Sequence, residues 1–168
     1  VFTASGNALF NNKNVGTGKP VSVTGISLSG ADAGNYSPNA TTTTTADITA
    51  RALTITAVGV DKVYDGTTTA TVNLTDNRVS GDVVTDVQTS ALFASPNAAN
   101  GIGISVTGIS ISGADAGNYT FNTTANTTAN ITKRPVTVKV DDVTLTWTGS
   151  PLPPVYSLTR TGGMTFPG

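Results

Sequence analysis

Apolar and polar residues alternate with a period of two along much of the chain, which is the spacing of a half-buried β-strand. Leu53, Ile55 and Ala57 fall on one face of such a strand with threonines between them, and residues 70–74 repeat the pattern. Turn signals such as Asp65-Gly66 interrupt the alternation at short intervals. This spacing predicts about six or seven short strands in each 83-residue stretch of chain.

The alternation changes phase at two glycines. Apolar residues occupy even-numbered positions before Thr107-Gly108 and odd-numbered positions after it. Thr24-Gly25 stands at the matching place in the preceding repeat. A glycine at such a phase change is typical of a β-bulge, where one extra residue is inserted into a strand. We therefore predict a bulge at each of these positions.

An internal repeat organises the chain. Residues 23–36 read VTGISLSGADAGNY and residues 106–119 read VTGISISGADAGNY, identical at 13 of 14 positions with an offset of 83 residues. Strands and turns recurring at a fixed period indicate tandem modules. We divide the chain into the C-terminal part of one repeat (residues 1–50), a complete repeat (residues 51–133) and the N-terminal part of a third (residues 134–168).

A D-x-G-x-Y motif sharpens the expected fold class. It occurs in both repeats, at Asp32, Gly34, Tyr36 and again at Asp115, Gly117, Tyr119. In a β context it resembles the tyrosine corner of immunoglobulin-like domains, in which the phenol bonds to backbone a few residues upstream. We expect an all-β chain of tandem immunoglobulin-like β-sandwich modules, with these residues in structural roles. The alternative is a β-grasp-like module, in which residues 85–94 form a short helix.

Composition argues against catalysis. The 168 residues contain no Cys, no His and no Glu, so thiol and imidazole nucleophile systems and disulfides are excluded within this sequence. A net charge of -1 with scattered Lys and Arg residues does not favour nucleic acid as a partner. No apolar stretch approaches the roughly 20 residues of a membrane-spanning helix. We expect no enzyme activity, no cofactor and no membrane span in this fragment.

The start of the complete repeat carries a more specific motif. Residues 62–68 read KVYDGTT, with Tyr64, Asp65 and Gly66 at the centre. Together with the GADAGNY endings, this segment resembles the YDG domain of large bacterial exoproteins. The third repeat departs from it: Trp147-Thr148-Gly149 replaces the Tyr-Asp-Gly turn and is followed by prolines and Tyr156, which resembles the related MBG module.

The resemblance implies a setting and a role. YDG modules recur in filamentous-haemagglutinin-like and other two-partner-secreted adhesins, so we expect a secreted protein of the bacterial cell surface. The implied function is that of stalk or spacer repeats that serve cell adhesion or biofilm formation. Neighbouring repeats are the expected partners, and host-surface or matrix polysaccharide would be bound through other domains. The alternative is that the modules themselves bind glycan or matrix polymer, with Trp147 and Tyr156 stacking on sugar rings.

A calcium site is the only metal hypothesis that the sequence offers. Asp32 and Asn35, and the matching Asp115 and Asn118, carry oxygen atoms of the kind that Ca²⁺ prefers. Asp, Gly and Asn are also the residues that a tight turn requires, and too few carboxylates cluster to fill six or more ligand positions. A structural role in the turn is the favoured interpretation, and calcium is the alternative.

Overall fold

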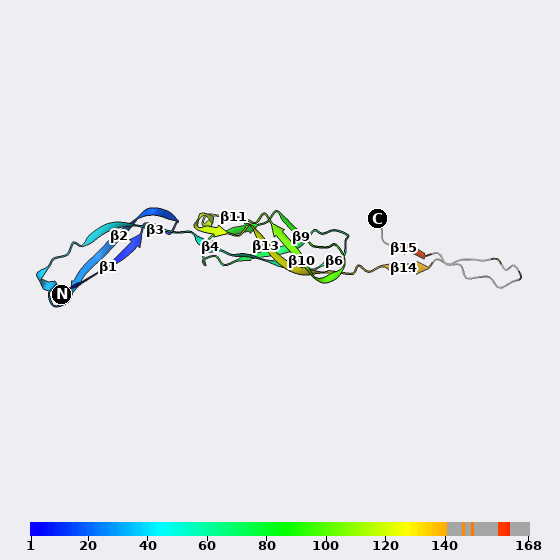
Figure 1. The fold of residues 1–168 in the computed structure, drawn as a ribbon, viewed down its shortest axis with the longest axis horizontal. Helices are drawn as coiled ribbons and strands as arrows, with labels where there is room; N and C mark the ends of the chain where they lie inside the picture. The colour runs from blue at the N-terminus through cyan, green and yellow to red at the C-terminus, as the bar shows by residue number, and fades with distance from the viewer. Residues whose placement is uncertain (141–145, 147–148, 150–157, 162–168) are drawn as a thin grey trace. The chain divides into compact units, whose positions relative to one another are not determined.

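The computed structural model describes residues 1–140, 146, 149 and 158–161, and within them the chain is built from short β-strands (Figure 1). It divides into two compact units. One contains residues 1–57, 74–90 and 106–125, and the other contains residues 58–73, 91–105 and 126 onward. The division does not follow the sequence repeats, because the first unit includes both residues 1–50 and part of the complete repeat.

Residues 1–50 form a three-stranded antiparallel sheet in the order β1-β2-β3 (Figure 1). The strands are β1 (Thr3–Phe10), β2 (Gly16–Ser29) and β3 (Thr41–Ile48). A short 3₁₀ turn, η1 (Ala33–Asn35), lies between β2 and β3. Val21, which is 6% exposed, is the one buried hydrophobic residue in this part of the chain, so the sheet buries little apolar surface within residues 1–50.

The rest of the first unit comes from the complete repeat. Strand β4 (Arg51–Leu53) pairs in parallel with β12 (Tyr119–Phe121), and β8 (Thr85–Val87) pairs antiparallel with β11 (Ser110–Ser112). A second 3₁₀ turn, η2 (Ala116–Asn118), precedes β12. The buried apolar side chains of the complete repeat in this unit alternate with exposed residues, and they are Leu53, Ile55, Val84, Val106, Ile109 and Tyr119.

The second unit is organised by a four-stranded sheet in the order β6-β13-β10-β9. Its buried apolar residues are Val72, Ala91, Phe93, Ile104, Ala129 and Ile131. The sheet strands are β6 (Lys62–Val63), β13 (Thr124–Thr132), β10 (Ala99–Thr107) and β9 (Ser90–Phe93), with β6 parallel to β13. The pair β14 (Thr137–Val140) with β15 (Leu158–Thr161) also belongs to the second unit, whereas the residues of the pair β5 (Ile55–Val60) with β7 (Thr71–Asp76) are divided between the two units.

The all-β prediction is confirmed for the described residues. The short helix that a β-grasp module would place at residues 85–94 is wrong: this segment forms β8 and β9, because Val87, Ala91 and Phe93 follow the two-residue period of a strand. Within the described part of the chain, no helix is long and apolar enough to cross a membrane.

The predicted β-bulge is present at Gly25 but not at Gly108. Gly25 has φ +62°. Beside it, one residue of β1 lies opposite two residues of β2, which is a β-bulge. Gly108 has φ +66° and lies in the gap between β10 and β11. At this second position the phase change therefore marks the point where the chain leaves one sheet and pairs with β8 in another.

Candidate repeat-joint site

A loop between β1 and β2, residues 11–15, is shaped by a buried lysine. The ammonium of Lys19 donates hydrogen bonds to the Asn12 side chain and to the Asn14 carbonyl oxygen. The Asn14 N–H donates to Asn12 Oδ1 at 3.0 Å, a local turn bond that asparagine commonly makes. Lys19 is 9% exposed, whereas the side chain of Lys13 on the same loop is 61% exposed. The loop thus presents Lys13 outward.

Lys13 reaches two carboxylates of the complete repeat. Its Nζ lies 2.6 Å from Asp82 Oδ1 and 2.7 Å from Asp115 Oδ1. Hydrogen bonds to Asp115, the larger cause, and to Asp82 raise the pKa of Lys13 above its usual range. The bond from Lys13 is also the largest cause that lowers the pKa of each carboxyl. Both carboxylates are therefore ionised at neutral pH, and the lysine is the cation that they share.

Two hydrogen bonds between amide groups lie beside this ion pair and, being directional, fix the relative orientation of the two loops. The Val15 N–H donates to Asn118 Oδ1 at 2.9 Å, and Asn118 Nδ2 donates to Asn14 Oδ1 at 3.3 Å. We call Lys13, Asn14, Val15, Asp82, Asp115 and Asn118 the repeat joint. A hollow of about 240 Å³ lies beside it, lined by residues that include Ile48, Arg51 and Tyr119.

The D-x-G-x-Y motif of the complete repeat positions one half of the joint. Asp115 Oδ2 accepts a hydrogen bond from the Val83 N–H at 2.8 Å, and the Asp115 N–H donates to the Val83 carbonyl at 3.2 Å. Gly113, with φ +118°, makes this close approach possible, since a Cβ there would lie 2.4 Å from the Val83 oxygen. Asp115 is therefore held by the backbone on one side and by Lys13 on the other.

Tyr119 secures the segment that carries Asp82. Its hydroxyl donates to Asp82 Oδ2 at 2.6 Å and accepts a hydrogen bond from the Val79 N–H at 3.0 Å. The residue is 7% exposed. The tyrosine corner predicted a backbone partner a few residues upstream, but the observed partner lies 40 residues earlier. The phenol ties β12 to a distant loop, a contact that no local sequence pattern indicates.

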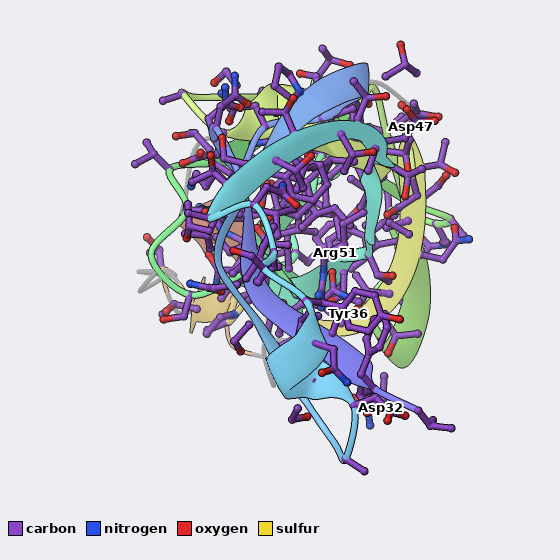
Figure 2. All side chains as sticks on the ribbon, turned by 90° about the vertical axis from the view of Figure 1, so that its left-hand side faces the viewer. Asp32, Tyr36, Asp47 and Arg51 are labelled. Atoms are coloured by element: carbon purple, nitrogen blue, oxygen red, sulfur yellow. The ribbon has the colours of Figure 1, made fainter. Side chains whose placement is uncertain are left out.

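The same motif in the preceding repeat has a different environment. Asp32 and Tyr36 lie close together at the end of the sheet where β1 begins and β2 ends (Figure 2). The Asn35 N–H donates a hydrogen bond to the Asp32 carbonyl oxygen at 3.1 Å. Tyr36 is 58% exposed, and its ring packs against Phe2 with the centroids 4.9 Å apart. Gly34, in η1, has open space around it.

The Lys-x-Tyr-Asp-Gly turn in the second unit is held by a single lysine. Lys62 Nζ donates to Asp65 Oδ1 at 2.9 Å and to the carbonyl oxygens of Thr67 and Thr69 at 2.8 and 2.9 Å. Asp65 Oδ1 also accepts from the Thr67 N–H at 2.9 Å. The Lys62 bond is the main reason that the pKa of Asp65 falls to about 2.

The ends of this turn are fixed by backbone geometry. Gly66 has φ +82°, a conformation that side chains rarely adopt, and the Tyr64 N–H bonds to the Thr132 carbonyl at 2.9 Å. The motif is thus a turn whose hydrogen bonds are made within it, and it is attached to the last strand of its repeat, β13. Its polar groups are occupied by one another, which favours a structural role.

The calcium candidates of the complete repeat are already engaged by protein groups. At Asp115 and Asn118 a divalent cation would have to displace Lys13 and the Val15 N–H. Among the residues that the structure describes, no three acidic, His or Cys side chains gather as metal ligands do. Trp147, Tyr156 and the MBG-like motif lie outside the described residues.

The sequence pointed to Asp115, Asn118 and Tyr119 but missed Lys13, Lys19 and Asp82. Comparison of the repeats gave no signal for the two lysines, because the residues 83 positions later are Pro96 and Ile102. The one hint in the sequence was the difference between the repeats. Two lysines lie close together in the first repeat of a chain that has nine cationic residues, and the next repeat lacks both.

The sequence model of the YDG domain matches residues 1–45 and 49–129, and the chain belongs to the YDG domain family. Neither a curated protein nor a solved structure gave a match.

Proposed function

We propose that this chain is a run of spacer repeats from a secreted bacterial surface adhesin, acting in cell adhesion or biofilm formation. Its modules would be tandem immunoglobulin-like β-sandwiches that end in an MBG-like module, and they would hold a binding region away from the cell. Membership of the YDG domain family supports this setting through the exoproteins in which such modules recur.

The observation that carries the proposal is the repeat joint. A spacer has to limit bending where one module meets the next, and a short connection with direct contacts does this better than a Gly/Ser-rich linker. Only Thr49 and Ala50 separate β3 from β4. Across this short connection, Lys13 is bonded to two carboxylates whose side chains are each 11% exposed. These contacts join successive repeats through specific side chains.

Direct ligand binding by the modules is the competing function. Hollows of about 240, 330 and 370 Å³ lie among the residues that the structure describes. The aromatic residues that line them are Tyr119 and Phe93, which are 7% and 3% exposed. A sugar site ordinarily presents an accessible aromatic face, so these hollows favour a spacer over a glycan-binding module.

Backbone NMR relaxation tests the spacer proposal. Amides of β1–β3 and amides of β8, β11 and β12 should report one common rotational correlation time. The variant Lys13→Met should separate the two values, whereas Lys133→Met, the same loss of charge at an exposed site, should not. Independent tumbling of the two sets in the unmodified chain would refute a stiff joint.

A glycan and matrix-polymer array tests the alternative. We expect no binding above background from the 168-residue chain. Reproducible binding that Trp147→Ala or Tyr156→Ala abolishes would replace the spacer function with a binding function.

A further inference from the structure

A cluster of two buried carboxyl groups and one partly exposed guanidinium lies at the base of the loop that carries Asp82. The side chains of Asp76, at the end of β7, and Asp86, in β8, are 1% and 5% exposed. Arg78 Nε donates to Asp76 Oδ1 at 2.9 Å, and its Nη2 lies 3.4 Å from Asp86 Oδ2. Its Nη1 donates to the Val84 carbonyl. The three residues close the loop formed by residues 77–84.

The charges in this cluster do not balance when both carboxyls are ionised. One guanidinium then faces two buried carboxylates, and Asp86 Oδ1 is buried without a donor. A buried acceptor that lacks a donor destabilises the folded state, and so does an uncompensated buried charge. One proton bound between Asp76 and Asp86 would supply the missing donor and make the cluster neutral.

The surroundings of Asp86 favour its protonated form, with one opposing group. Burial, followed by the hydrogen bond and charge of Asp76, raises the pKa of Asp86 to about 6, and Arg78 is the only group that opposes the rise. The Arg78 bond lowers the pKa of Asp76 to about 2. On β11, the residue opposite Asp86 is Ile111, which cannot titrate. On β12, Tyr119 affects the pKa of Arg78 and is not among the groups that shift the pKa of Asp86.

The cluster is physically continuous with the repeat joint. The loop that it closes supplies the Val79 N–H to the Tyr119 hydroxyl, the Asp82 carboxylate to Lys13 and the Val83 N–H to Asp115. A change in the stability of this loop therefore reaches the face that receives Lys13. We propose that Asp76, Arg78 and Asp86 form a proton-operated latch, in which proton uptake stabilises the 77–84 loop and with it the repeat joint.

The direction of the pH effect follows from linkage. Because the pKa of Asp86 is higher in the folded state than the ordinary 3.8 of an unfolded chain, the stabilisation is complete below about pH 4 and is lost as pH rises through about 6. A pKa difference of this size changes the folding equilibrium constant by up to about a hundredfold. Proton uptake therefore strengthens the latch in mildly acidic solution, and the latch is weaker at neutral pH.

Amide hydrogen exchange in the 168-residue chain tests the latch. After correction for intrinsic exchange, the Val79 and Val15 amides should be at least about tenfold better protected at pH 5 than at pH 7.5. Asp86→Asn, which mimics the protonated carboxyl, should remove this pH dependence and give strong protection at both values. Asp47→Asn, the same substitution at an exposed carboxyl on β3, should keep the pH dependence of the unmodified chain.

Direct titration of Asp86 by carboxyl ¹³C NMR in the unmodified chain tests whether Asp86 takes up a proton near pH 6, even if a variant fails to fold. A midpoint near 6 supports the latch. A midpoint below about 4.5, or equal protection of Val79 at pH 5 and pH 7.5, overturns it. The spacer proposal is tested separately, because Lys13→Met can loosen the joint whether or not Asp86 titrates near 6.

Discussion

Replacing Gly113 by alanine tests whether the GADAGNY turn has the backbone geometry on which the joint depends. Gly113 has φ +118°, and a Cβ there would lie 2.4 Å from the Val83 carbonyl oxygen and 3.0 Å from its carbon. The contacts are with backbone, so no flexible side chain can move aside. The same motif contains Gly117, whose φ is not in the positive region and whose Cβ would meet no atom within 4 Å.

The two substitutions should differ widely in cost. For Gly113→Ala, an unfavourable backbone region costs about 1–3 kcal/mol, and overpacking against backbone adds about 1–3 kcal/mol. In a unit of roughly 60–100 residues, the size of the one that contains Gly113, a total of about 3 kcal/mol lowers the melting temperature by roughly 12–24 °C. Gly117→Ala should leave stability unchanged or raise it by up to about 1 kcal/mol, because alanine reduces the freedom of the unfolded chain.

Thermal unfolding followed by circular dichroism measures both variants against the unmodified chain. We expect a large loss for Gly113→Ala and none for Gly117→Ala. A Gly113→Ala variant that melts within about 2 °C of the unmodified chain, or equal losses of stability in the two variants, would contradict the backbone clash at Gly113.

Three further substitutions test other parts of the structure. Tyr119→Phe should lower the melting temperature by about 4–8 °C, because the Val79 N–H loses its acceptor, whereas Tyr36→Phe should change it by less than about 1 °C; equal shifts would contradict the assigned roles. Ile104→Ala, at a residue that is 1% exposed, should cost about 2–5 kcal/mol in urea unfolding with an unchanged m-value, and a loss under about 1 kcal/mol would show that the residue is not in a packed core. The Asp65 carboxylate should stabilise the fold above about pH 4, with the effect lost as pH falls through its pKa of about 2. Asp65→Asn should therefore melt below the unmodified chain at pH 6, and the difference should shrink toward pH 2; a constant difference would rule out the ionised carboxylate as the cause.

The local structure could be predicted from the sequence where it depends on neighbouring residues. Alternation placed Leu53 and Ile55 in the core, and both are 2% exposed. The phase change at Gly25 predicted a bulge that the β1–β2 register shows. These features follow from side-chain alternation and glycine backbone freedom, which act over a few residues and are therefore visible in the sequence.

The contacts that build the joint could not be predicted because their partners are far apart in the chain. Lys13 meets Asp82 and Asp115 across separations of 69 and 102 residues, and Tyr119 bonds to Val79 across 40. Neither strand period nor turn chemistry specifies which surface loop a charged side chain will reach. The sequence identified the acidic half of the joint as a possible cation site, and the cation that occupies it is a lysine.

Distance measurement across the repeat joint tests the spacer proposal most directly. The chain has no cysteine, so Thr43→Cys on β3 and Thr123→Cys, both exposed, give two unique sites for spin labels. Pulsed electron paramagnetic resonance should show a single narrow distance distribution in this double variant. Addition of Lys13→Met should broaden it, and addition of Lys133→Met should leave it narrow. A broad distribution that Lys13→Met does not change would mean that the repeats move freely and that the contacts of Lys13 do not stiffen the chain.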